Sequence, residues 1–523
     1  MSSVVVIGAG HNALVAATLL ARAGLQVTVC EAAEVLGGAA RTEHPFPKVP
    51  GLGQSTGAYL LGLMPPELMA TLDLELPLLR RDPHYFLPTL GSEYLLVGRD
   101  GPQGELFGPA DRAADARLQA ELAQLRTDLA PAWLAEPLDV EATAERYIRP
   151  SLRDPFVRLV TGSVAEYLDR FGFASELAVA MYATTDGLSG LHAGPDTPGS
   201  GHNFLVHNMC RIPEADGTWL IVRGGMGSVT GALADLARGA GVTLHTDMRV
   251  TAVVTAGGSP DTPDARRVTG VQVSRGLRGG TRAADELTAD VVVAGCDPWQ
   301  LANLVPLPGD LTQRLDRIRR TGTTLKVNLA LGALPSFRCL PADTPTPFGA
   351  TIHLLPQDAP MAAIRTMWRD VQTGRLPAIP TIEWYVHTTV DPTLQDPDGH
   401  HSAALFVQSV PYEPAGSSWP VELDGYVRQL LAICDAFAPG TSGLVVDTLA
   451  LPPPAIEARF GMSGGHIHHV DNTVAFDQRM PYRTGVDGLY AASAGCHPAG
   501  SVIGAAGYNA ARRILADLGT PVR

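Results

Sequence analysis

The sequence contains very little lysine, no two cysteines close together along the chain and no long apolar segment. Only Lys48 and Lys326 are lysines, and we attribute this scarcity to genome composition rather than to chemistry. The six cysteines stand singly and form no C-x-x-C pair, which argues against a redox-active dithiol and against a zinc knuckle. No apolar run is long enough to cross a bilayer. The net charge of −14 argues against direct binding of nucleic acids, because phosphate contacts need a basic face.

The composition is that of a globular protein with more than one core. Of the 523 residues, 45% are hydrophobic and 18% are charged. A chain of this length exceeds one ordinary core, so two or three subdomains are expected. The first predicted strand begins at residue 4, which leaves no room for a signal peptide and predicts a cytoplasmic protein.

The N-terminal stretch has the pattern of a dinucleotide-binding unit. A buried strand is expected over residues 4–7, a helix over 13–23 and a second strand over 27–30. The turn between the first strand and the helix reads Gly8-Ala9-Gly10-His11-Asn12-Ala13. A lone glycine motif is a weak signal, but a complete strand–turn–helix–strand unit strongly favours dinucleotide binding.

Each part of this unit answers a physical demand of the ligand. Gly8 permits a tight turn, Gly10 lets a pyrophosphate approach the backbone, and Ala13 lets the helix lie close to the strand. The helix N-terminus offers unpaired N–H groups to the phosphates. Glu31 can accept hydrogen bonds from both ribose hydroxyls and would repel a 2′-phosphate. The unit therefore favours FAD or NAD over NADP.

A glycine doublet after the second strand favours the flavin. Gly37 and Gly38 would let the backbone pass beneath an extended pyrophosphate and ribityl chain, whereas the fingerprint of NAD enzymes normally ends at the acid. Arg41, with Thr42 beside it, could neutralise phosphate charge. A solvated surface arginine is the alternative interpretation of Arg41.

The C-terminal stretch 488–511 supplies a complement to this unit. It reads as a strand, a glycine-rich turn and a helix from about residue 502 to 518, whose N-terminus could point at the flavin and stabilise its anionic reduced form. The turn contains the cofactor-binding candidates Gly495, Gly500, Ser501 and Val502. His497, in the same turn, is the catalytic candidate, and it could instead cap the following helix.

The order of predicted elements indicates an α/β protein. We expect a discontinuous Rossmann-like FAD-binding domain (1–82, 205–300 and 465–523) and a second, α+β substrate domain of a mixed sheet plus helices (83–204 and 301–464). Leucines spaced at helical intervals (118, 122, 125 and 129) predict helices in the region 109–182.

Two further patterns imitate ligand sites. Gly225-Met226-Gly227 follows a short expected strand (220–222), and a helix, a strand and then Asp247 come after it. This order resembles a second dinucleotide fingerprint. The histidines His466, His468 and His469 suggest a metal site, but on one expected strand they would face opposite sides, and no carboxylate nearby completes a ligand set. No metal is therefore expected.

Taken together, these motifs resemble the phytoene desaturase-like superfamily of FAD-dependent oxidoreductases. Within it, the pattern resembles that of pyridine nucleotide-disulphide oxidoreductase domain-containing protein 2 and its bacterial relatives. The resembling stretches extend over nearly the whole chain and include 7–42, 219–254 and 488–511.

The resemblance implies a set of FAD contacts and also shows two departures. It implies that the ADP half is held by Gly8, Gly10, Glu31, Gly38 and Arg41, that Val250 meets adenine, and that Gly495, Gly500 and Val502 meet the diphosphate and isoalloxazine. It also implies that the glycines at 224–227 are structural. The family turn usually reads His-Pro-Gly-Gly-Gly, but here Ala499 and Ser501 replace glycines.

The resemblance implies an oxidoreductase that removes hydride from an apolar, isoprenoid- or carotenoid-type substrate and passes it to flavin N5. Such a reaction needs few acid–base groups, because the cofactor performs the difficult step. A flavin amine oxidase and a flavoprotein that acts mainly as a binding or assembly factor are the alternatives. An apolar substrate would come from a bilayer, so peripheral membrane contact through an exposed patch is expected, with 59–64 as a candidate.

Overall fold

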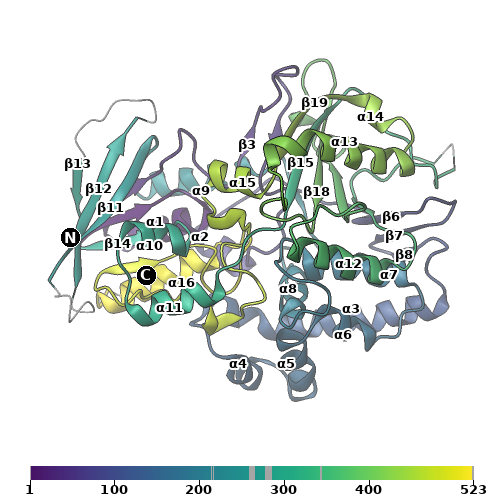
Figure 1. Ribbon diagram of the computed structural model, residues 1–523. Coiled ribbons are helices and arrows are strands. Elements are labelled where there is room, and N and C mark those ends of the chain that lie inside the picture. The colour runs from purple at the N-terminus through teal and green to yellow at the C-terminus, as the bar shows by residue number, and fades with distance from the viewer. Residues whose placement is uncertain are drawn as a thin grey trace.

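The computed structural model describes residues 2–213, 215, 217–257, 266–276, 285–341 and 344–520, and it contains two sheet-based halves with a layer of helices beside them (Figure 1). The first half is built on a five-stranded sheet in the order β10-β2-β1-β14-β20, in which every pair is parallel. Its strands are β1 (Ser3–Ile7), β2 (Gln26–Cys30), β10 (Thr243–His245), β14 (Val291–Ala294) and β20 (Leu489–Ala491). Three separated stretches of the chain thus share one sheet.

The helix that follows β1 lies at the centre of this half. Helix α1 (His11–Arg22) packs against α9 (Gly227–Gly239) on one side and α16 (Ala505–Asp517) on the other. Seven of its residues besides Asn12 are buried, because most of its side chains are apolar and neighbouring elements cover it. An antiparallel sheet packs on β14, and its strands are β11 (Met248–Ala256), β12 (Arg267–Arg275) and β13 (Asp285–Thr288). The remaining helices of this half are α2 (Pro66–Leu72), α10 (Pro298–Leu304) and α11 (Gly309–Ile318).

The second half is built on an eight-stranded mixed sheet in the order β19-β15-β18-β17-β16-β6-β7-β8. Its strands are β6 (Tyr85–Pro88), β7 (Tyr94–Gly98), β8 (Gly101–Gln103), β15 (Leu325–Leu331), β16 (Thr351–Leu354), β17 (Ile382–Val386), β18 (His401–Val407) and β19 (Val445–Leu451). One face carries aliphatic and aromatic side chains that pack with α13 (Trp419–Phe437) into a hydrophobic core. Because side chains alternate along a strand, the intervening residues face the opposite side.

A helical layer flanks both halves. The leucines of α3 (118, 122, 125 and 129) are all buried, which confirms the helix predicted from their spacing. Helices of the layer and of the second half are α3 (Pro109–Leu129), α4 (Val140–Tyr147), α5 (Arg153–Thr161), α6 (Val164–Asp169), α7 (Glu176–Tyr182), α8 (Ser200–His207), α12 (Pro360–Gln372), α14 (Thr441–Leu444) and α15 (Pro453–Phe460). A π-helical turn, Ala183–Leu188, links α7 to the connector before α8. Two short ladders pair β3 (Thr42–Glu43) with β4 (Gln54–Ser55) and β5 (Leu78–Leu79) with β9 (Ile221–Val222).

The predicted fold class is confirmed, and two local predictions are corrected. The strand expected near 220–222 is present as β9, and it pairs antiparallel with β5 outside the five-stranded sheet, so it does not begin a second dinucleotide unit. The last helix begins at Ala505 rather than at residue 502. Residues 466–469 form a turn rather than a strand, because Gly464, Gly465 and His469 all have positive φ angles. The exact domain boundaries stay a prediction.

A buried arginine holds the turn that leads into α16. All donor nitrogens of the Arg479 guanidinium are used: Nε donates to the carbonyl of Cys496, Nη1 to those of Asp471 and Val474, and Nη2 to those of Val470 and Ala494, at 2.9–3.1 Å. Arg479 is 1% exposed. These bonds fix 470–474 against 494–496, of which Ala494 lines the cavity described below.

We expect Arg479→Met to destabilise the protein by about 3 kcal/mol or more, because five buried carbonyl groups would lose their donors. Arg483→Met is the matched control: Arg483 is exposed and pairs with Asp517, so its loss should cost less than about 1 kcal/mol. Thermal and urea unfolding of the two variants would check this, and equal losses would contradict the role assigned to Arg479.

Candidate cofactor and substrate cavity

One cavity of about 660 Å³ connects the two halves of the molecule. At one end it is lined by the turn between β1 and α1, and at the other by the inner face of the eight-stranded sheet. This volume lies in the range of small-molecule and cofactor sites. The predicted cofactor residues that line it are Gly8, Gly10, His11, Asn12, Ala13, Glu31, Gly37, Gly38, Val250, Ser501 and Val502.

The turn before α1 presents bare backbone to the cavity. Gly8 has a φ of +85°, which favours glycine, and its N–H donates to the carbonyl of Cys30 at 2.8 Å. A Cβ atom placed on Gly10 would meet nothing within 4 Å, so this residue faces open space in the described structure. Gly10 caps α1 without a side-chain hydrogen bond, which leaves N–H groups of the first turn for a ligand.

Glu31 is held at the end of β2 by two backbone donors. Its carboxylate accepts from the N–H of Ala9 and from the N–H of Ala33, each at 2.8 Å. The carboxylate is therefore fixed beside the glycine turn and lines the cavity. This is the position from which an acid could bind the ribose hydroxyls of an adenine dinucleotide.

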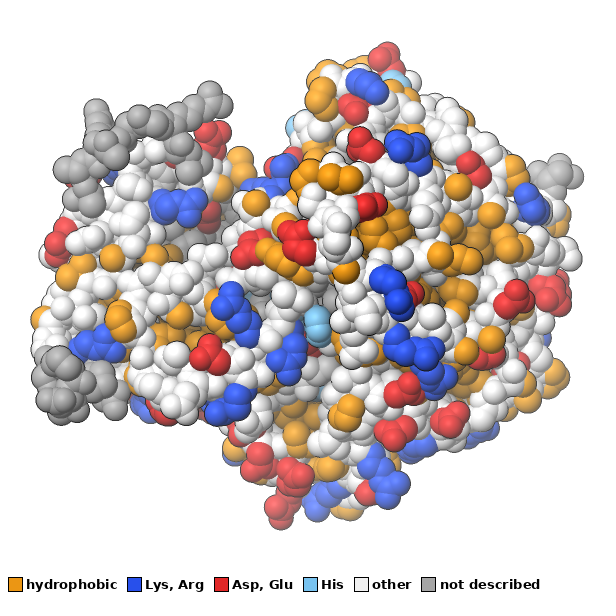
Figure 2. Space-filling view, in the orientation of Figure 1, with side chains coloured by type: hydrophobic (Ala, Val, Ile, Leu, Met, Phe, Trp, Pro, Cys, Tyr) orange, Lys and Arg blue, Asp and Glu red, His pale blue; other side chains and the backbone are white. Residues whose placement is uncertain are grey.

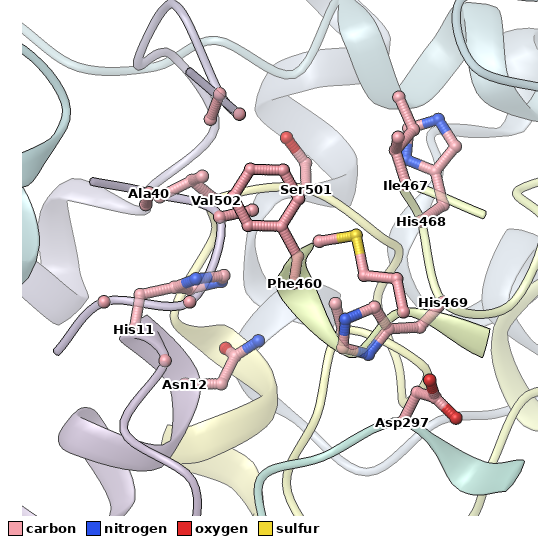
Figure 3. A pocket seen from close by; sticks show the side chains of 18 of the residues that line it. His11, Asn12, Ala40, Asp297, Phe460, Ile467, His468, His469, Ser501 and Val502 are labelled. Atoms are coloured by element: carbon pink, nitrogen blue, oxygen red, sulfur yellow. The ribbon is translucent and has the colours of Figure 1, made fainter. Parts of the chain in front are cut away.

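Buried polar atoms without partners test whether this end fits FAD. His11 Nε2, Asn12 Oδ1 and His469 Nδ1 are buried and have no hydrogen-bond partner among the described residues. Figure 3 shows these three side chains around the cavity, together with Ser501 and Val502. Burial, with His469 nearby, lowers the pKa of His11 to about 4, so its ring is neutral at physiological pH. A polar ligand that accepts and donates here would satisfy these groups, as the phosphates and ribityl hydroxyls of FAD would.

Two residues of the predicted glycine-doublet motif lie behind the cavity wall. The guanidinium of Arg41 lies 4.9 Å from the ring centre of Phe460, and its Nε is 3.4 Å from a carboxylate oxygen of Glu43. The hydroxyl of Thr42 donates to the carbonyl of Gly224 at 2.8 Å and so ties this loop to the start of α9. Neutralisation of phosphate by Arg41 stays a prediction.

The C-terminal turn contributes Ser501 and Val502 to the cavity wall, whereas Gly495 and Gly500 are absent from the described lining. A Cβ on Gly500 would lie 2.3 Å from the carbonyl oxygen of His468, and one on Gly495 would lie 2.9 Å from Pro298, so both glycines permit close packing. His497 is buried, its Nε2 lies 2.9 Å from the carbonyl oxygen of Ala132, and it is absent from the described cavity lining. Its catalytic role therefore stays a prediction that this placement does not favour.

The sheet end of the cavity is lined by charged side chains. Lys326 on β15, Phe406 on β18 and Glu383 on β17 stand side by side in register on three neighbouring strands. The Lys326 ammonium lies 4.2 Å from the ring centre of Tyr59 and 4.4 Å from that of Phe406. The hydroxyl of Tyr385 donates a short hydrogen bond to the Glu383 carboxylate. Sequence reasoning missed this wall.

Burial changes the protonation of the groups in this wall. It raises the pKa of Glu383 and of Asp186 to about 7. Each carboxylate also accepts a hydrogen bond from a tyrosine hydroxyl, which lowers its pKa but does not offset the effect of burial. It also lowers the pKa of Lys326 to about 7, against the attraction of Glu383. All three groups can therefore exchange protons near neutral pH, and each lines the cavity.

Two histidines of the cluster, His466 and His468, are satisfied by protein groups. His466 Nε2 lies 2.9 Å from an oxygen of Asp471, so a carboxylate nearby in sequence does pair with this segment, contrary to expectation. His468 Nε2 lies 2.9 Å from the carbonyl oxygen of Ser189. Within the described ranges, the residues spaced for a metal ion are instead Asp396, Asp398 and His400.

The segment expected to contact a membrane is buried. Leu61, Leu63 and Met64 are at most 1% exposed, because they belong to the hydrophobic cores. In the described part of the chain no helix is both long and apolar enough to cross a bilayer. On the face shown in Figure 2, basic and acidic side chains are interspersed.

Comparisons with known proteins agree with this geometry. The family described as flavin containing amine oxidoreductase matches residues 14–377. The chain is 32% identical to pyridine nucleotide-disulfide oxidoreductase domain-containing protein 2 of Rattus norvegicus, over 98% of this chain and 93% of that protein. It is 27% identical to the hydroxyneurosporene desaturase of Rhodobacter capsulatus, over 99% and 98% of the two chains. An oxidoreductase structure from Methanosarcina mazei has a similar fold, with a TM-score of 0.61 at 15% identity, over 98% of this chain and 100% of that one.

We expect Glu31→Ala to weaken FAD binding at least about tenfold. The glycine turn would lose the carboxylate that accepts from the N–H groups of Ala9 and Ala33, and the ribose would lose its hydrogen-bond acceptor. Glu34→Ala changes an exposed acid three residues away and should leave FAD retention unchanged. The ratio of flavin to protein absorbance after gel filtration, and titration of the apoprotein with FAD, would measure both. Equal FAD affinity in the two variants would contradict the assignment.

We expect Lys326→Met to stabilise the protein below about pH 7 by several kcal/mol, on the order of 4. The pKa of Lys326 falls from 10.5 to about 7 on burial, so the folded state carries the cost of a buried charge below pH 7 and loses it as pH rises toward 10.5. The gain should therefore shrink between pH 7 and 10. Unfolding at pH 6 and 9 would measure it, with exposed Lys48→Met as control; a gain independent of pH would contradict the burial cost.

Proposed function

The chain belongs to the family of flavin containing amine oxidoreductases, and within this family we propose that it is a desaturase-type dehydrogenase that removes hydride from a carbon atom of its substrate. It is an FAD-dependent oxidoreductase. The observation that carries the proposal is the single cavity that joins the glycine turn to the wall of the second half. A cofactor at one end and a substrate at the other would share one enclosure, as transfer between them requires.

The residues at the glycine end are assigned to the cofactor. Gly10 and the first turn of α1 would face the pyrophosphate, Glu31 the ribose, and His11 and His469 the polar atoms between pyrophosphate and flavin. When bound, FAD supplies a two-electron acceptor at N5 of its ring system. The chain's own contribution is to align the reacting bond and to keep water out.

The second hydrogen of a desaturation leaves as a proton, and Glu383 is the group that we assign to accept it. Its carboxyl lines the cavity and is oriented by the hydroxyl of Tyr385 and by Gln408 Nε2 at 2.7 Å. With a pKa of about 7 the carboxylate is a more effective base than an exposed acid, yet is still present at neutral pH.

The relatives support this reaction class. One protein to which the chain is similar over nearly its whole length is named a hydroxyneurosporene desaturase. The predicted substrate, an isoprenoid-type hydrocarbon, would lie against Leu60, Phe406 and Ile467. The charged side chains of the same wall favour a substrate that also carries a polar group, because a pure hydrocarbon would leave them without partners.

Amine oxidation is a second candidate, favoured by two rings at the same end of the cavity. The centroids of Tyr59 and Tyr385 are 5.2 Å apart, and both rings line it. An aromatic pair can flank a substrate amine. We rank this candidate below desaturation because the ammonium of Lys326 already lies over the Tyr59 ring, where a substrate amine would have to bind.

Anaerobic reduction of the FAD-loaded protein tests the proposal. We expect isoprenoid alkenes or their oxygenated derivatives to bleach the visible flavin band, and primary amines such as putrescine to leave it unchanged. Glu383→Gln should slow bleaching at least about tenfold while FAD remains bound, since a general base contributes a hundredfold or more. Bleaching by amines alone would favour the second candidate. Retention of FAD without reduction by either class would favour a binding factor.

A further inference from the structure

Asp186 is a second buried acid at the substrate end of the cavity. It belongs to the π-helical turn Ala183–Leu188, whose residues are all buried, and it lines the cavity. Asn203 Nδ2 holds this turn by donating to the carbonyls of Asp186 and Gly187 at 3.1 and 3.2 Å. Single π-helical turns are frequent at functional sites. The position of the Asp186 carboxyl is therefore fixed by the backbone of the turn.

The turn that carries Asp186 is tied to Glu383 by two side chains. Gln408 Nε2 donates to the Glu383 carboxylate at 2.7 Å and to the carbonyl of Thr184 at 3.3 Å. The side chain of Thr185 makes a hydrogen bond with Glu383 that lowers the pKa of this acid. The two acids line one chamber, and the negative charge of Glu383 acts on Asp186.

Opposite influences assign the charge of this pair to Glu383 and the proton to Asp186. Burial raises the pKa of both acids to about 7. The ammonium of Lys326 lowers the pKa of Glu383, whereas the negative charge of Glu383 raises that of Asp186. Hydrogen bonds from Tyr85 and Asn208 lower the pKa of Asp186 but do not offset burial. At neutral pH the proton of the pair therefore lies mainly on Asp186.

Other titratable groups around Asp186 are neutral at this pH. His207 Nδ1 lies 4.0 Å from the Asp186 carboxyl, and burial lowers the pKa of the ring to about 3. Burial raises the pKa of the remaining neighbours, which are Tyr85, Tyr182 and Cys210. Arg81 lines the same end of the cavity and donates to the neutral oxygens of Trp219 and Thr351. Since a protonated carboxyl can donate, Asp186 offers the cavity a hydrogen-bond donor rather than a second anion.

A neutral acid and an ionised acid in one chamber can act together on a carbonyl compound. A carboxyl that burial keeps protonated can donate to a carbonyl oxygen, and it stabilises the negative charge that develops there when the neighbouring carbon loses a proton. The second acid, as a carboxylate, can accept that proton. Asp186 and Glu383 have these two protonation states and line the same cavity.

We propose that the substrate is a ketone or an aldehyde, that Asp186 donates a hydrogen bond to its carbonyl oxygen, and that the bond between its α and β carbons is desaturated. The inference rests on the proposed function and names its substrate class. The α C–H bond breaks and its proton goes to Glu383. The β C–H bond breaks and its hydrogen leaves with both electrons as hydride to FAD, which is reduced. A C=C bond forms, and the carbonyl group is retained.

Hydrogen exchange of acetophenone in heavy water tests this inference without oxidation of the ligand. Acetophenone cannot be desaturated, but its methyl hydrogens are α to a carbonyl group. The FAD-loaded protein should speed deuterium incorporation into this methyl group at least about tenfold over buffer, as followed by mass spectrometry. Asp186→Asn should slow the exchange at least about tenfold relative to wild type, because an amide is a weaker acid than a carboxyl group.

Asp115→Asn is the matched control. Asp115 is also a buried acid, it accepts from the hydroxyl of Tyr182 at 2.7 Å, and it is absent from the described cavity lining. Its substitution should leave the exchange of acetophenone unchanged.

The affinity for acetophenone should also depend on pH. Calorimetry at pH 6 should show acetophenone binding at least about tenfold more tightly than ethylbenzene. The affinity should fall at least about tenfold between pH 7 and 9, because Asp186 loses the proton that it donates. Asp186→Asn should remove this pH dependence. Tyr85→Phe should move the fall to higher pH, since the Tyr85 hydroxyl lowers the pKa of Asp186, and it serves as the test where Asp186→Asn does not fold.

Three results would overturn the inference: equal exchange in wild type and Asp186→Asn, a ketone that binds no more tightly than the hydrocarbon, or an affinity that does not change with pH. Flavin bleaching by alkenes without exchange of acetophenone overturns it and leaves the proposed function intact. Failure of the proposed function is a different result, in which acetophenone exchanges its hydrogens but neither alkenes nor ketones with saturated α and β carbons, such as geranylacetone, bleach the flavin.

Discussion

The contact between α1 and α16 is the constraint on which the cofactor end of the cavity depends. A Cβ atom on Gly507 would lie 2.0 Å from the backbone oxygen of Asn12, so the two helices approach as closely as backbone allows. This contact brings the strand–turn–helix at 489–517 against the glycine turn at residues 8–13. Without it, Ser501 and Val502 could not share a cavity with Gly10, and the two ends of the chain would form separate surfaces.

The substrate end of the cavity is formed by a sheet with two different buried faces. One face packs in a hydrophobic core, and the other lines the cavity. Leu325, Val327 and Trp384 face the core with α13, whereas Lys326, Glu383 and Tyr385 face the cavity. The apolar face supplies the stability of the half. The polar face is then free to carry charge, because the strands stay in place without its contribution. Alternation along a strand thus separates folding from recognition.

The cofactor end could be predicted from sequence because its parts lie within a few residues of one another. Gly8, Gly10 and Glu31 belong to one strand–turn–helix–strand unit, and the structure places all three at the cavity. The substrate wall could not be predicted in the same way, because Lys326 and Glu383 meet only through the strand order β15-β18-β17. A signal did exist: a lone lysine within the alternating strand 325–329. The scarcity of lysine was attributed to genome composition, and the position of Lys326 was not considered, although the structure buries it at the cavity.

The histidine segment illustrates the opposite error, in which a local pattern is overruled by backbone conformation. We expected one short strand at 466–469, but His469 has a φ of +59° and the chain turns there. The turn lets His466 reach Asp471 and leaves His469 facing the cavity near His11. Hydrogen bonds across the turn and the φ preferences of Gly464 and Gly465 outweigh the propensity of the four residues.

The two ends of the cavity differ in how they can change, and this difference bears on function. The cofactor end is made largely of backbone groups, so it follows from the fold and from small residues such as Gly10. The substrate end is made of side chains on a sheet whose stability comes from its other face, so a single substitution there can change the charge of the wall without changing the fold. Proteins with this architecture can therefore share a cofactor and differ in substrate. For this chain, the ionisable side chains of the wall, Lys326, Glu383 and Asp186, bear on the substrate more directly than the fold does.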